Sequence, residues 1–112
     1  MTPAQDADGQ QAAGRLWERA AHAASDVGDY GTAVRYADRA RADYLRCGQA
    51  RAAARAQAVA GEALRLWGHN TEARDRLTSA MEVLRADPDR DTVRALDHLA
   101  TVAVLALSLI HI

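Results

Sequence analysis

The chain contains neither phenylalanine nor lysine, and it has one cysteine and two prolines among its 112 residues. The lone cysteine, Cys47, cannot form an internal disulfide, and no second cysteine is present to share a zinc ion with it. Arginine is the only strong base, and 15 acidic residues against 14 basic ones leave a net charge of −1. Nucleic-acid binding needs a surplus of positive charge, so we expect no direct contact with nucleic acid.

The chain also lacks recognisable targeting segments. The N-terminal stretch MTPAQDADGQQ is polar and acidic, without the charged-then-apolar layout of a signal peptide. The apolar run over residues 99–112 is shorter than the ~20 residues that a membrane-spanning helix requires, and it contains His111. We therefore expect a cytoplasmic protein with no membrane partner, in which residues 1–10 are disordered.

Strand signals are nearly absent, whereas alanine, leucine, arginine and glutamate, which favour helices, dominate the chain. Breaker-rich stretches divide it at DVGDYG, RCGQ, WGHNTE and ADPDRD. These stops predict an all-α fold with five helices, at about 11–27, 30–46, 49–67, 71–86 and 89–106. Because the loops are short, neighbouring helices should pack as antiparallel hairpins.

A repeat is visible when the chain is aligned with itself at an offset of 40 residues. Gly28 then falls on Gly68, at the same helix-to-helix turn, and Arg15 falls on Arg55. This predicts about two and a half repeats of 40 residues, with units over 11–48 and 49–88 and an incomplete one over 89–106.

The repeat unit resembles the tetratricopeptide repeat. In unit one the motif positions are held by Trp17, Ala20, Ala21, Ala24, the GDY turn over 28–30, Ala33, Ala37 and Ala40. In unit two they are held by Gln57, Ala60, Gly61, Leu64, Gly68, Ala73, Leu77 and Ala80. The missing tryptophan in unit two and a period longer than the standard ~34 residues depart from the motif. The resemblance implies stacked helical hairpins, an α-solenoid, similar to the repeat regions of large high-GC bacterial regulators or signalling ATPases.

The small residues at the predicted crossings should let helix backbones approach closely. We expect Leu16, Trp17 and Val27 to fill the seam between the first two helices, together with Val34 and Ala37. The last helix should expose an uncovered apolar face, through which the chain is expected to self-associate. That face comprises Leu96, Leu99, Val102, Val104 and Leu105.

The final stretch, LSLIHI (residues 107–112), holds both isoleucines of the chain. An in-frame translation of the end of a widely used transposon-based sequencing adapter gives the same six residues. We interpret them as an adapter scar, so that Ala106 is the last natural residue and the chain is a fragment of a longer protein. The alternative is a genuine hydrophobic helix end.

No catalytic motif, phosphate loop or metal-ligand spacing is present. We therefore expect no enzyme activity, no cofactor and no metal. In tetratricopeptide repeats the first helix of each unit lines a groove, and the resemblance carries that role to Arg15, Glu18, His22, Arg55, Glu62, Arg65 and His98. Arg15 and Arg55 could together hold a partner's carboxylate bidentately; the alternative is a solvated, salt-bridged helix face.

These features predict a non-catalytic scaffold that binds a peptide or a partner domain in a helical-repeat groove. A first alternative is a regulatory or spacer arm of a multidomain transcriptional regulator, nucleotide cyclase or signalling ATPase. A second alternative, a small stand-alone enzyme, finds no supporting constellation of side chains.

Overall fold

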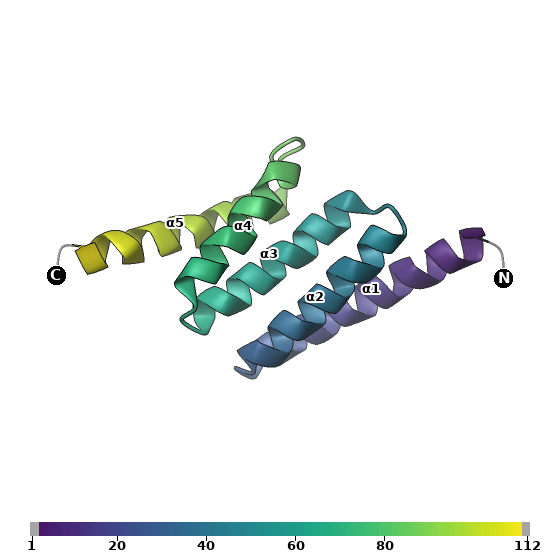
Figure 1. The fold of residues 1–112 in the computed structure, drawn as a ribbon, viewed down its shortest axis with the longest axis horizontal. Helices are drawn as coiled ribbons and strands as arrows, with labels where there is room; N and C mark the ends of the chain where they lie inside the picture. The colour runs from purple at the N-terminus through teal and green to yellow at the C-terminus, as the bar shows by residue number, and fades with distance from the viewer. Residues whose placement is uncertain (1–2, 111–112) are drawn as a thin grey trace.

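The computed structural model describes residues 3–110, and this part of the chain folds into five α-helices joined by short turns (Figure 1). The helices are α1 (Pro3–Asp26), α2 (Tyr30–Arg46), α3 (Ala50–Leu66), α4 (Asn70–Leu84) and α5 (Arg90–Ile110). The predicted all-α fold of sequential antiparallel helices is confirmed. None of the described helices is both long and apolar enough to cross a membrane.

The helix ends differ from the prediction at both termini of the chain. α1 begins at Pro3, within the segment expected to be disordered, rather than at residue 11. Proline suits the first turn of a helix because it has no N–H to leave unbonded and its φ is already helical. α5 continues through Ile110 instead of ending at 106. Residues 111–112 of the LSLIHI stretch lie outside the described residues, and its origin as an adapter scar stays a prediction.

Three glycines turn the chain between the first four helices. Gly28, Gly48 and Gly68 have φ angles of 80°, 74° and 88°, a left-handed conformation that side chains with a Cβ disfavour. The backbone N–H of the residue after each glycine donates to the carbonyl oxygen five residues before it, over 2.9 Å, 2.9 Å and 2.8 Å. This pattern closes the helix end, and each following helix runs back beside its predecessor.

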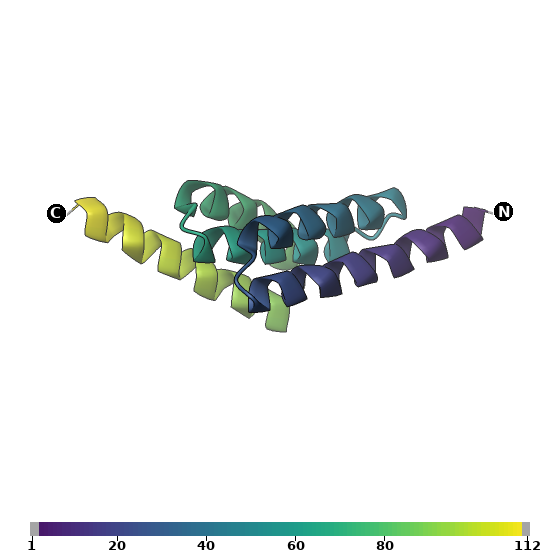
Figure 2. The same ribbon diagram turned by 90° about the horizontal axis from the view of Figure 1, so that it is seen from below.

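The helices form an elongated body of 59 × 31 × 19 Å. Figure 2 shows α1 and α5 on one side, α2 and α4 on the other, and α3 between them. α3 therefore contacts every other helix of the bundle. The two termini point away from each other at opposite ends of the body (Figure 1).

The core consists mainly of alanine. The helices cross so closely that a Cβ added at Gly61 would lie 2.7 Å from Cγ of Leu77, and one at Gly14 would lie 2.8 Å from the ring of Tyr44. The largest fully buried side chains are Tyr44, Leu64, Leu77 and Leu84, and glycines face two of them, Gly14 at Tyr44 and Gly61 at Leu77. All but one of the alanines expected at the crossings are buried there: Ala21, Ala24, Ala33, Ala37, Ala40, Ala60, Ala73 and Ala80. The exception, Ala20, is partly buried.

The prediction is wrong for two of the residues that it assigned to the seam between α1 and α2. Leu16 is 64% exposed and Val27 is 80% exposed, so neither fills it. Tyr44 takes that place because Gly14 leaves room for its ring, and Trp17 packs beside it. Trp17 also contacts Tyr36, with ring centroids 5.2 Å apart.

The apolar face of α5 is also only partly uncovered. Val102 is buried against Leu64 and Ala73, and Leu99 packs beside Ala95, contrary to the prediction that both are exposed. The remaining three residues of that face, Leu96, Val104 and Leu105, are exposed as predicted.

Replacing Gly61 with leucine should destabilise the fold. The new side chain would collide with Leu77 at the α3–α4 crossing, and overpacking of this kind costs about 1–3 kcal/mol. Urea unfolding followed by circular dichroism measures the loss. Gly9→Leu is the matched control, because a Cβ at Gly9 meets no atom within 4 Å. Equal effects of the two substitutions would contradict the close crossing.

Candidate functional site

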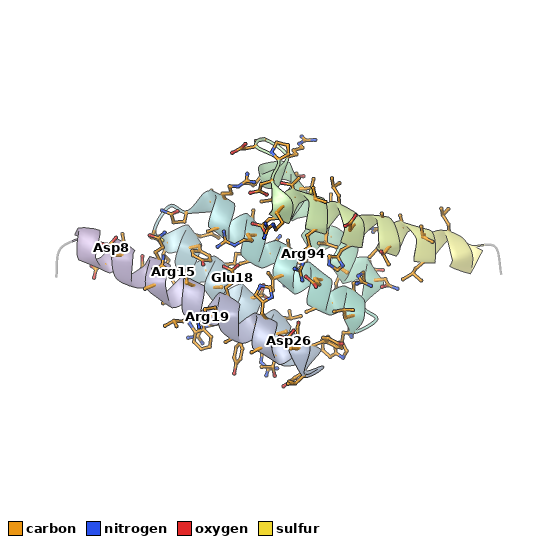
Figure 3. The ribbon with its side chains drawn as sticks, turned by 180° about the vertical axis from the view of Figure 1, so that it is seen from behind. Asp8, Arg15, Glu18, Arg19, Asp26 and Arg94 are labelled. Atoms are coloured by element: carbon orange, nitrogen blue, oxygen red, sulfur yellow. The ribbon has the colours of Figure 1, made fainter. Side chains whose placement is uncertain are left out.

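Polar side chains from α1, α3 and α5 gather on one face of the molecule, which is turned toward the viewer in Figure 3. They surround a hollow of about 100 Å³ whose floor is formed by Ala58, Val59 and Ala95. We call this surface the α1/α3/α5 face. Its polar lining consists of Glu18, His22, Arg55, Glu62, Asp91, Arg94 and His98.

Most of the groove residues expected from the sequence meet at this face. The structure brings together Glu18, His22, Arg55, Glu62 and His98 around the hollow. The other two lie outside the hollow. Arg65 reaches His98 from α3, whereas Arg15 is exposed on α1 (Figure 3) and takes part in no hydrogen bond or ion pair among the described residues.

Two lining residues, Asp91 and Arg94, were not expected. Within the ADPDRD stretch, Asp89 caps the start of α5 by accepting from the amide of Thr92 over 3.1 Å, whereas Asp91 faces the hollow. A helical spacing of three and four residues places Asp91, Arg94 and His98 on one face. That signal in the sequence could have found them.

Glu18 links α1 to both α2 and α3. Arg55 on α3 donates from Nε to Oε2 over 2.7 Å and from Nη2 to Oε1 over 2.9 Å. The hydroxyl of Tyr44 on α2 donates to Oε1 over 2.8 Å. A carboxylate with these three donors joins three helices at one point.

The environment shifts the pKa values of this cluster. Burial by itself would raise the pKa of Glu18, but the hydrogen bonds from Arg55 and Tyr44 outweigh it and the net pKa is lowered. Burial, followed by the bond to the charged Glu18, raises the pKa of Tyr44 to about 12. Glu18 therefore stays ionised and Tyr44 stays protonated at neutral pH.

A second cluster joins α3 to α5 around Glu62. Arg94 donates from Nε to Oε2 over 3.0 Å and from Nη2 to Oε1 over 2.8 Å, and Nε2 of His98 lies 3.5 Å from Oε2. The other ring nitrogen of His98, Nδ1, accepts from Nε of Arg65 over 2.8 Å. Since Nδ1 accepts, the ring proton belongs on Nε2, facing Glu62.

These contacts hold Glu62 in its ionised form. Burial opposes the charge, but the hydrogen bonds from His98 and Arg94 outweigh it and lower the pKa of Glu62 to about 2. The hydrogen bond to Glu62 is also the main cause of the raised pKa of Arg94. The face therefore carries fixed charges of both signs at neutral pH.

The idea that Arg15 and Arg55 form two free forks does not fit this geometry. The guanidinium of Arg55 is already occupied by Glu18, as in the alternative of a salt-bridged helix face. The exposed guanidinium at the hollow is that of Arg94, whose side chain is 58% exposed. Among residues 3–110 no three His, Cys, Asp or Glu side chains are placed to share a metal ion.

Comparison of the chain with protein-family models, with curated proteins and with solved structures gave no match. The resemblance to tetratricopeptide repeats therefore stays a prediction. Any function has to be argued from the residues and contacts of this chain.

Glu62→Gln should lower stability at neutral pH and flatten its dependence on acid. A carboxyl whose pKa falls from 4.5 to about 2 on folding stabilises the fold above pH 4.5, and that contribution is lost as the pH falls toward 2. We expect about 1–2 kcal/mol at pH 7, less than the full shift implies because Arg94 is half exposed. Urea unfolding at several pH values measures it. If the variant loses stability between pH 4.5 and pH 2 as steeply as the wild type does, the proposed contacts of Glu62 with Arg94 and His98 would be contradicted.

Arg55→Ala should destabilise the fold far more than Arg15→Ala. Removing Arg55 leaves the largely buried Glu18 without its cation, which we expect to cost about 2–3 kcal/mol, below the range for a fully buried pair. Arg15 is exposed, and its loss should stay within about 0.5 kcal/mol. Thermal and urea unfolding compare the two. A similar small effect of both would show that the link from α1 to α3 contributes little.

Proposed function

We propose that the chain is a non-catalytic binding module whose α1/α3/α5 face holds a short segment of a partner protein. The observation that supports it is the convergence of fixed charges from three helices around one hollow. The apolar floor of the hollow gives a small side chain a place to pack, and the charged rim orients the segment around it.

The exposed groups of this face define what a partner should offer. Arg94 uses Nε and Nη2 on Glu62, which leaves Nη1 to donate to an incoming carboxylate or carbonyl. Asp91 lies at the same rim and accepts hydrogen bonds. A segment with an acidic side chain opposite Arg94 would match this arrangement.

We further propose that the helices form a solenoid of the tetratricopeptide type. Two turns support it, because Asp29 N bonds to Ala24 O and His69 N bonds to Leu64 O, 40 residues further along. Buried positions follow the same offset. The pairs are Ala21 with Gly61, Ala33 with Ala73, Ala37 with Leu77, Ala40 with Ala80, and Tyr44 with Leu84.

A second function is favoured by the pairing of charges within the face. Glu18 with Arg55 and Glu62 with Arg94 neutralise each other and tie α1, α3 and α5 into one body. A spacer or regulatory arm of a multidomain protein needs this rigidity and no free binding groups. The two functions differ in whether Arg94 exchanges its contacts for those of a partner.

Selection of random peptides displayed on phage against the whole chain tests the binding function. We expect enriched peptides to carry an acidic residue and to shift the amide NMR signals of His22, Arg94 and His98. Arg94→Ala should weaken the binding of these peptides about tenfold. Arg46→Ala is the matched control, because this arginine on α2 is 61% exposed and lies outside the hollow. Absence of enrichment, or peptides indifferent to Arg94→Ala, would favour the arm instead.

A further inference from the structure

A second hollow lies between the start of α4 and the outer side of α5. It encloses about 800 Å³, and its lining includes Asn70 and Arg74 on α4 and Leu96, Ala100, Ala103 and Leu107 on α5. All four of these α5 side chains are exposed. We call this surface the α4/α5 groove; it shares no lining residue with the α1/α3/α5 face.

α3 shows how such a helix is covered in this fold, because two neighbouring stripes of its residues are buried. The stripe that packs against α2 consists of Ala53, Ala56, Ala60 and Ala63, spaced by three, four and three residues. The second stripe lies one residue further along and packs against α4. It includes Ala54, Gly61 and Leu64.

α5 repeats the first stripe but leaves the second one open. Its buried stripe follows the same three, four, three spacing and packs on α3 and α4; it consists of Thr92, Ala95, Leu99 and Val102. The stripe one residue further along consists of Val93, Leu96, Ala100 and Ala103, and all four are exposed. α5 therefore presents the surface that on α3 is covered by α4.

The way α4 sits on α3 indicates what would cover α5. Leu77 inserts at Gly61. The place equivalent to Gly61 in the open stripe is Ala100, 39 residues further along, and its Cβ would hold a covering leucine further out than Leu77 lies on Gly61. The indole of Trp67, at the end of α3, lies over Gly31 at the start of α2. A Cβ built at Gly31 would lie 3.3 Å from that ring. The start of α4 that borders the groove is the equivalent part of the next hairpin.

Charge adds a requirement on the occupant. Arg76 on α4 is held by Asp38 on α2, over 2.5 Å and 3.0 Å, so the covering helix pairs its charge with the preceding hairpin. Arg74 lies on the rim of the α4/α5 groove; its side chain is 62% exposed, and its nearest carboxylate among the described residues, Asp75, is 3.6 Å away. An acidic residue on the occupant would complete the rim.

We propose that the α4/α5 groove binds an amphipathic helix of a partner protein, lying antiparallel to α5. Its contact stripe carries alanine and leucine spaced by four, three and four residues, as Ala73, Leu77, Ala80 and Leu84 are on α4. A leucine sits over Ala100, and an acidic residue faces Arg74.

A synthetic peptide covering His69–Arg85, capped at both ends, is the probe, because it carries the stripe that fits α3. It is titrated into the 15N-labelled whole chain and followed by amide NMR shifts. We expect saturable shifts confined to 93–107 and to the start of α4. Ala100→Arg should weaken binding about tenfold by filling the groove. Thr101→Arg, an exposed position on the other side of the same helix, is the matched control and should bind as the wild type does.

Three outcomes would overturn the proposal. Absence of saturable shifts would show that no such helix docks, and shifts centred on Ala54 and Gly61 would show that the peptide displaces α4 instead. Shifts that depend on protein concentration without peptide, and vanish in Ala100→Arg, would assign the groove to a second copy of the chain.

Discussion

The close approach of α3 to its neighbours is the constraint on which the rest of the structure depends. Alanines line the stripe of α3 that packs on α2, Gly61 lies in the stripe that packs on α4, and the Cβ distance at Gly61 shows that no larger residue fits there. A buried alanine contributes only about one methyl group of apolar burial, roughly 0.8 kcal/mol. A core of this kind therefore relies on good fit and on polar links between helices more than on large apolar side chains.

The charged clusters are a consequence of that short spacing. Glu18 and Arg55 lie on α1 and α3, two helices that are separated in sequence by α2, yet they meet in a bidentate pair. Glu62 and Arg94 do the same between α3 and α5. A shift of α3 by one residue would turn both side chains away from their partners. Such pairs add modest net stability after desolvation, but they can fix one register of packing, which an alanine surface specifies weakly.

The sequence predicted the existence of the helices and the positions of the turns well, because glycine and helical periodicity act locally. It predicted packing less well. Val27 precedes a turn glycine and is 80% exposed, although its apolar character suggested a place in the seam between the first two helices. Periodicity also cannot decide which of two neighbouring stripes faces inward. On α5 the stripe of Val102 turned inward and that of Leu96 outward, a choice that depends on the tertiary contact with Leu64 and Ala73.

Most of the charged face was expected, because the resemblance to tetratricopeptide repeats assigns Glu18, Glu62 and His98 to a groove, and the structure brings them around one hollow. Their pairing was not, because the partner of Arg55 is set by the distance between α1 and α3. α5 contributes Arg94 to one proposed binding surface and Ala100 to the other, so the two surfaces share this helix. A helix docked over Ala100 would hold α5 against α3 and α4, and would thereby hold Arg94 on Glu62. Ligands of the two surfaces should then be coupled through the position of α5.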